Sequence, residues 1–185
     1  MLDKISLRRQ TNAFAMQYGM IYGLYWCLSF LFLVSTQPSL QSLGTILFIS
    51  TPFVGFYLAR RFSATVRSDG PVTYGRCYFF SLLTYCYATA ILAITSYCYF
   101  RFIDHGHFIA YNLEILDRPD VKQLFASPDV KNQMGGLKID DLKTALQSLT
   151  PISITASVIN MSILAGLFLS IPTALFGTLD KRYKR

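Results

Sequence analysis

The chain has 185 residues, of which 52% are hydrophobic and only 15% charged, whereas about 25% of the residues of a typical soluble domain are charged. Three stretches contain no Asp, Glu, Lys or Arg: residues 10–59, 77–100 and 144–179. Stretches this long exclude a soluble domain and favour a membrane protein, because about 20 apolar residues are needed to cross the hydrocarbon core of a bilayer.

The uncharged stretches predict four membrane-spanning helices in a single membrane domain that covers residues 1–185. We expect the spans at about residues 14–34, 40–59, 77–102 and 152–176. A polar segment, residues 104–150, separates the last two spans. It should form two or three short helices broken at Pro119, Pro128 and Gly135-Gly136. The expected fold class is therefore all-α: a four-transmembrane-helix bundle with a short helical outer (periplasmic) segment between helices 3 and 4.

Basic residues flank the spans unevenly, which predicts the orientation of the chain. Eleven Lys and Arg residues lie in the N-terminal flank, the loop after the second span and the C-terminal tail, against five in residues 104–150. Because positive residues favour the cytoplasmic side, we expect both termini in the cytoplasm and residues 104–150 outside. The net charge of +7 does not indicate nucleic-acid binding, which requires a clustered basic face.

Small residues recur every four positions along the spans, a pattern typical of helices that pack closely in lipid. The stripes contain the five residues that we expect to pack the bundle: Gly19, Gly23, Gly55, Gly166 and Ser170. The alternative is that one stripe contacts a partner helix, because GxxxG faces also dimerise.

Two spans contain an internal proline, Pro52 and Pro172, and each proline removes one backbone donor and predicts a bend. Broken helices also line the binding sites of transporters. However, no Asp, Glu, Lys, Arg or His lies in the middle of any span, where ion-coupled transporters usually place one. A transport function is therefore an alternative that lacks its usual signature.

Asp104, His105 and His107 form a cluster with the chemistry of metal ligands at the end of the third span. Such His-x-His pairs bind zinc or copper, whereas the other interpretation is a solvated turn that ends the helix. Asp117 and Asp120 are paired acids, which elsewhere hold magnesium. We expect no metal, no cofactor and no catalytic residue, because nucleotide-binding, hydrolase and metalloprotease motifs are absent from the sequence.

Two motifs around the third span carry a resemblance to a known family. The first is the turn Asp69-Gly70-Pro71-Val72-Thr73-Tyr74-Gly75-Arg76-Cys77-Tyr78, which is similar to the family's Gly-x-Ile-Ser-Phe-Gly-x-Ala-Phe run. The second is the aromatic exit Tyr99-Phe100-Arg101-Phe102-Ile103-Asp104, which is similar to the family's exit ending in Ile-Asp or Ile-Asn. With its four spans, the chain resembles the bacterial four-span domain-of-unknown-function 4199 family.

This resemblance implies a multi-pass protein of the bacterial inner membrane and transfers no catalytic residue. It also implies a partner, since members are encoded beside a glycosyltransferase similar to polyprenyl-phosphate sugar synthases. We therefore expect a non-catalytic accessory or anchoring subunit that contacts membrane lipids and a protein partner, either the glycosyltransferase or a second copy of the chain. A small transporter or channel subunit and a membrane sensor that uses residues 104–150 are the alternatives.

Four arginines between the second and third spans are the candidate contact residues: Arg60, Arg61, Arg67 and Arg76. At the membrane surface, basic residues attract anionic headgroups by roughly 1 kcal/mol each. The more specific hypothesis is that they contact the partner or its polyprenyl-phosphate substrate, because arginine binds phosphate bidentately. The basic tail at residues 181–185 should extend this cytoplasmic ring.

Overall fold

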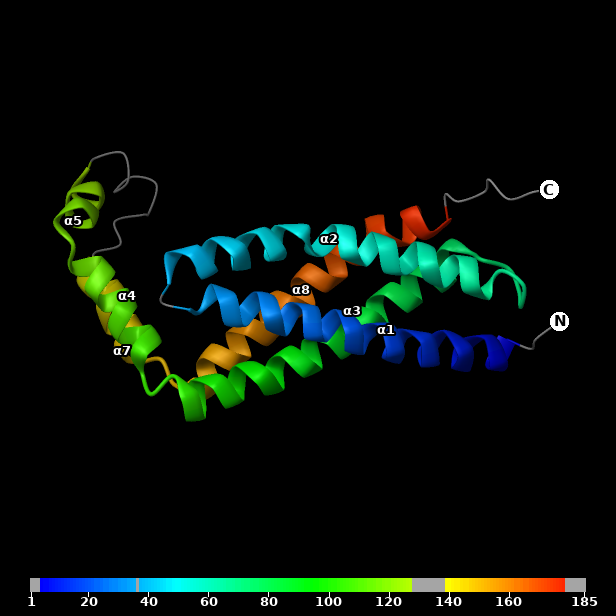
Figure 1. The fold of residues 1–185 in the computed structure, drawn as a ribbon, viewed down its shortest axis with the longest axis horizontal. Coiled ribbons are helices and arrows are strands. Elements are labelled where there is room, and N and C mark those ends of the chain that lie inside the picture. Colours follow the sequence, from blue (N-terminus) through cyan, green and yellow to red (C-terminus); the bar gives the residue numbers. More distant parts are fainter. Residues whose placement is uncertain (1–3, 36, 128–138, 179–185) are drawn as a thin grey trace. The chain divides into compact units, whose positions relative to one another are not determined.

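The computed structural model describes residues 4–35, 37–127 and 139–178, and in these ranges it contains helices and no strand (Figure 1). The described chain divides into two compact units. The first contains the residues up to Ser96 and those from Ala156 onward, and the second contains Tyr97–Thr155. The first unit is the helix bundle and the second holds the short helices.

Four long helices carry the uncharged stretches: α1 (Lys4–Leu33), α2 (Pro38–Val66), α3 (Tyr74–Cys98) and α8 (Pro151–Thr178). Each is long and apolar enough to cross a membrane, so the chain is a multi-pass membrane protein. Three of the four, α1, α2 and α8, are longer than the expected spans, as α2 shows by continuing past Arg61 to Val66, whereas α3 begins three residues before its expected span and ends four residues before the end of it. A helix satisfies its own backbone hydrogen bonds, so nothing forces it to end at the membrane surface.

A row of hydroxyl groups on α1 donates hydrogen bonds to backbone carbonyls of the antiparallel helix α2. Three bonds form this hydroxyl ladder: Tyr22 to the carbonyl of Thr51 (2.9 Å), Tyr25 to that of Leu47 (2.6 Å) and Ser29 to that of Gly44 (3.1 Å). Counted along each helix, the donors and the acceptors are spaced by three and then four residues. This spacing keeps the donors on one side of α1 and the acceptors on the facing side of α2. Polar bonds between helices stabilise association in lipid, where apolar contact alone gives little preference.

The side chain of Tyr85 on α3 contacts the other three long helices and is only 3% exposed. Its hydroxyl group lies 3.5 Å from that of Thr173 on α8, and its ring packs edge-on against Tyr22 of α1 at a centroid distance of 5.3 Å. Two glycines make room for it. A Cβ atom on Gly55 of α2 would lie 2.8 Å from the Tyr85 hydroxyl oxygen, and one on Gly166 of α8 would lie 2.9 Å from its Cβ. Tyr85 is therefore the centre of the bundle.

The glycines of α1 bring that helix close to α3. A Cβ atom on Gly19 would lie 2.6 Å from Cβ of Tyr87, and one on Gly23 would lie 3.0 Å from Cβ of Ile91. Ser170 of α8 is fully buried and donates to a backbone carbonyl one turn earlier in the same helix. The stripes of small residues thus lie where helices of the same chain meet.

Large apolar side chains cover the outer surfaces of the long helices. Phe53 on α2 and Met161 and Phe168 on α8 are all more than two-thirds exposed. Exposed apolar surface of this extent indicates contact with membrane lipid.

The second unit contains three described short helices: α4 (His107–Asp117), α5 (Pro119–Ala126) and α7 (Ile139–Gln147). Pro119 occupies the first turn of α5, where backbone N–H groups form no hydrogen bond within the helix, so the lack of an N–H does not weaken the helix. The expected breaks at Pro128 and Gly135-Gly136 lie outside the described residues. The side of the membrane on which this unit lies stays a prediction from the charge distribution.

Candidate functional site

The four arginines expected to contact phosphate or a partner lie at one end of the bundle, where α2 ends and α3 begins. Arg60 and Arg61 are in the last turns of α2, Arg67 is its C-cap, and all three are exposed. Since each helical residue turns the chain by about 100°, Arg60 and Arg67 share one side of α2, and Arg61 lies on an adjacent side.

Arg76 differs from these three because its guanidinium group is held by α1 and by the preceding loop. Its Nε donates to the hydroxyl oxygen of Thr11 (3.2 Å), its Nη2 to Oε1 of Gln10 (2.7 Å) and its Nη1 to the carbonyl of Pro71 (3.4 Å). The guanidinium carbon also lies 5.8 Å from the centroid of the Phe62 ring. Three bonds from one planar group fix its position, so Arg76 holds α3 to α1.

The turn between α2 and α3 is fastened to α1 through the same glutamine. Gln10 donates from Nε2 to Oδ2 of Asp69 (2.6 Å) while its Oε1 accepts from Arg76, so one amide connects a carboxylate with a guanidinium. The other carboxylate oxygen accepts from the hydroxyl group of Ser68 (3.1 Å), and the backbone N–H of Asp69 donates to the carbonyl of Val66. The carboxylate charge in this turn is therefore directed towards the loop and α1.

The exposed arginines next to this turn have the chemistry of an anion contact. A guanidinium group presents a fork of donors that matches a phosphate or a carboxylate. Tyr57, which is 59% exposed, and other apolar side chains of α2 precede Arg60 along the helix. The arrangement therefore combines an apolar surface with a basic end, and it suits a phosphate at a lipid surface. The basic tail predicted to join it, residues 181–185, lies outside the described residues.

Asp104, His105 and His107 are not arranged as a ligand set. The carboxylate of Asp104 is buried and accepts from the backbone N–H of Phe108 with both oxygens (3.0 and 3.2 Å), so it caps the start of α4. His105 is exposed in a turn with a φ of 47°. In the ranges that the structure describes, no three His, Cys, Asp or Glu side chains are grouped so that they could hold a metal ion.

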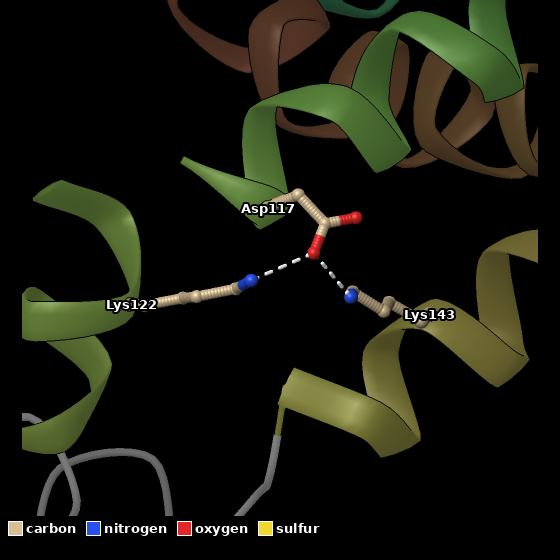
Figure 2. A network of polar contacts seen from close by, with 3 residues as sticks. All are labelled: Asp117, Lys122 and Lys143. Atoms are coloured by element: carbon tan, nitrogen blue, oxygen red, sulfur yellow. Dashed lines mark hydrogen bonds and ion pairs between the residues drawn. The ribbon is translucent and has the colours of Figure 1, made fainter. Parts of the chain in front are cut away.

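Asp117 connects the three short helices of the second unit, as Figure 2 shows. Its Oδ1 accepts from Nζ of Lys122 on α5 (2.8 Å) and from Nζ of Lys143 on α7 (2.7 Å). These hydrogen bonds, first that of Lys122 and then that of Lys143, lower the pKa of Asp117 to about 2. Asp120 lies in the first turn of α5, where a negative charge stabilises the helix N-terminus.

Sequence reasoning missed three features: the hydroxyl ladder, the capping role of Asp104 and the close approach at Gly44. A Cβ atom on Gly44 would lie 2.7 Å from the backbone nitrogen of Leu33. Gly44 precedes Gly55 by eleven residues, which is about three helical turns, so it lies on the same side of α2 and extends its small stripe, which is a signal in the sequence. An aspartate shortly before an apolar helical pattern is likewise a recognised start signal. The ladder has no such signal, because its acceptors are backbone atoms.

Comparison with known protein families gives a match. The model of a family described as "Protein of unknown function (DUF4199)" matches residues 17–178, which include all four long helices in whole or in large part. No curated protein and no solved structure matches the chain.

Proposed function

Because the chain belongs to the DUF4199 family, whose function is unknown, we propose a function from its own geometry: a non-catalytic accessory or anchoring subunit for a membrane-associated enzyme. In this proposal the protein lies in a bacterial inner membrane with both ends of the chain in the cytoplasm. The partner implied by the family resemblance is a glycosyltransferase that uses polyprenyl phosphate.

One observation supports this proposal above the others: Arg60, Arg61 and Arg67 present exposed side chains at the end of α2, next to Arg76, which a hydrogen-bonded network holds in place. If these arginines served only to orient the protein in the membrane, the positions of their side chains would not need to be fixed by hydrogen bonds. The turn that follows these arginines is bonded to α1 through Gln10, which contacts both Asp69 and Arg76. The guanidinium groups therefore lie beside a turn that is fixed to α1.

The spacing of two of these arginines suits a specific contact. Arg60 and Arg67 are separated by about 10 Å along the axis of α2, at 1.5 Å per residue. Attraction to anionic headgroups contributes roughly 1 kcal/mol per residue. A charge-assisted hydrogen bond to a phosphate or carboxylate of a partner contributes about 1.5–3 kcal/mol. Loss of both arginines should therefore weaken a specific contact much more than general attachment to the membrane.

The test is to replace Arg60 and Arg67 together with glutamine. In a strain that carries the glycosyltransferase, we expect correct membrane insertion, at least tenfold less co-purified enzyme and less lipid-linked sugar. Arg118→Gln, which removes one exposed charge from the second unit, is the matched control and should change neither quantity. If the inserted double variant retains both the partner and the sugar product, the proposal is wrong.

A small transporter or channel is the second candidate, and a different observation favours it. Trp26 Nε1, Ser81 Oγ and Thr89 Oγ1 are buried and have no hydrogen-bond partner among the described residues. Buried polar groups without partners are rare and need an explanation, and a polar solute between the helices would provide one. Uptake of a small solute into proteoliposomes would support this candidate if the Ser81→Ala and Thr89→Val variants lost it. These two variants should co-purify with an enzyme as the wild type does.

A further inference from the structure

A cavity of about 300 Å³ lies within the second unit, where the third long helix ends. Its wall contains the charged or titratable residues Arg101, Asp104 and His105 together with apolar Phe100, Ile109 and Ile154. Ligand pockets for drug-sized molecules range from about 300 to 1,000 Å³, so this cavity suits a small headgroup rather than a large ligand.

An unusual stretch of backbone builds this cavity. After α3 the chain forms a π-helical turn, Tyr99–Ile103, in which the N–H of Asp104 donates to the carbonyl of Tyr99 (2.9 Å). His105 and Gly106 then adopt φ values of 47° and 85°, in the left-handed region, and α4 begins immediately afterwards. A π-turn at the C-terminal end of a helix bonds one of its last carbonyls, and the left-handed residues that follow redirect the chain into α4.

The charges in the wall are divided between satisfied and available groups. The carboxylate of Asp104 is 6% exposed and both its oxygens already accept from the N–H of Phe108. Arg101 and His105 are exposed, and neither forms an ion pair with another described residue. Arg101 supplies a permanently charged group of donors, and the imidazole of His105 can donate one further N–H. Since no three potential metal ligands are grouped among the described residues, the cavity suits an anion better than a metal ion.

The position of Arg101 points to the membrane as the source of that anion. It lies two residues before the end of the apolar segment Tyr74–Ile103. The neighbouring Phe102 and Ile103 are more than 60% exposed. An arginine at the end of a spanning helix extends its guanidinium group to the level of the lipid phosphates while its stem stays among apolar groups.

We propose that this cavity binds the phosphodiester group of an anionic phospholipid, with Arg101 as the principal contact and His105 as a second donor. A phosphodiester carries one negative charge and pairs with the guanidinium of Arg101, whose donors match its oxygens. A phosphomonoester, with up to two charges, is repelled more strongly by Asp104. Phe100, Ile109 and Ile154 contact the glycerol and the first acyl carbons. This site lies at the end of α3 distant from Arg76 and does not depend on the function proposed above.

Native mass spectrometry of the full chain in detergent tests this proposal. Short-chain phosphatidylglycerol is the probe, and inorganic phosphate at the same concentration distinguishes a lipid from a soluble anion. We expect one tightly retained phosphatidylglycerol and no retained phosphate. Arg101→Gln should raise the apparent Kd at least tenfold, as loss of a charge-assisted bond predicts. Arg118→Gln, which removes a charge outside the cavity wall, should leave the Kd unchanged.

A second variant separates the contact from the fold of the turn. His105→Asn removes the imidazole but keeps a residue that tolerates the left-handed region, so the cavity should persist with a smaller loss of affinity. Unchanged retention in Arg101→Gln would overturn the proposal, and so would an equal loss in Arg118→Gln, which would indicate unspecific attraction. Retention of inorganic phosphate as tight as that of the lipid would overturn the assignment to a phospholipid.

Discussion

The hydroxyl group of Tyr22 on α1 donates a hydrogen bond of 2.9 Å to the backbone carbonyl of Thr51 on α2, one residue before Pro52. Pro52 has no N–H, so the helical hydrogen-bond pattern of α2 is interrupted within one turn of this contact. The bond therefore joins the two helices next to the point where α2 is intrinsically weakest. The other two bonds of the ladder lie between this contact and the α1–α2 loop.

Tyr22→Phe should destabilise the bundle by about 0.6 kcal/mol, and by no more than about 1.7, the range measured for hydrogen bonds between membrane helices. The ring contacts with Tyr85 and Trp26 survive this change, so the hydroxyl group alone is tested. Unfolding in mixed detergent measures the effect. Tyr74→Phe, at a position that is 42% exposed, is the control and should have no effect.

Gly44→Ala should destabilise the protein by about 1–3 kcal/mol, the usual effect of overpacking. The nearest atoms to the added methyl group are the backbone nitrogen of Leu33 (2.7 Å) and the backbone carbon of Phe32 (2.9 Å), which no side-chain rotation can move away. The same unfolding measurement is used.

Gly75→Ala is the matched control for Gly44→Ala. No atom lies within 4 Å of its added methyl group, and Gly75 is helical. Alanine forms helices better than glycine by up to about 1 kcal/mol, so this variant should be as stable as the wild type or more stable. If Gly44→Ala and Gly75→Ala both lowered the stability, the close approach of α1 and α2 at Gly44 would not be the cause of the loss.

Arg76→Gln should destabilise the bundle by about 1–2 kcal/mol, whereas Arg61→Gln should change its stability very little. The first change removes three hydrogen bonds from a half-buried group, and each bond of a charged group contributes about 1.5–3 kcal/mol before solvent exposure reduces it. A double-mutant cycle with Gln10→Ala measures the coupling, which should differ from zero. Additive effects of the two changes would contradict the network.

The carboxyl group of Asp117 should titrate with a pKa of about 2, below its ordinary value of 3.8. The ion pairs with Lys122 and Lys143 therefore stabilise the second unit fully above pH 4 and lose their effect as the pH falls through 2. NMR titration of the full chain checks this value. Lys122→Gln should raise the pKa most, Lys143→Gln less, and Arg118→Gln not at all. If the pKa of Asp117 stayed at its wild-type value in both lysine variants, these contacts would be excluded.

The proposed orientation predicts which cysteines react from outside the cell. In a variant that lacks the four native cysteines, Ser127→Cys should react with an impermeant thiol reagent in spheroplasts, and Ser68→Cys should react only after lysis. The opposite pattern would invert the topology and remove the arginines from the cytoplasmic side.

The four long helices could be predicted from the sequence because the requirement that produces them is local: an uncharged stretch long enough to cross a bilayer. The ends of the helices could not, since hydropathy marks where hydrocarbon begins, whereas α2 continues past Arg61 to Val66. The small-residue stripes identified faces of helices, but a stripe does not specify which helix it meets. Only the fold shows that Gly55 and Gly166 both make room for Tyr85.

The candidate site shows the same limit. Arg60, Arg61, Arg67 and Arg76 are equivalent in composition and neighbourhood along the chain. The difference between them arises because Thr11 and Gln10 contact Arg76 from 65 and 66 positions away, which no local pattern indicates. The neighbouring histidines of Asp104 indicate the chemistry of a metal ligand, yet its carboxylate accepts from a backbone N–H four residues later.

The hydroxyl ladder places unequal demands on the two helices that it joins. On α1 each bond requires a particular side chain, so a replacement of Tyr22 or Tyr25 preserves the bond only if the new residue carries a hydroxyl group at the same distance from the backbone. On α2 the acceptor is a peptide carbonyl, which every amino acid supplies. Evolutionary drift should therefore proceed faster at Leu47 than at Tyr25. Related sequences in which both tyrosines are lost together should have acquired a new hydroxyl donor elsewhere on the same face of α1.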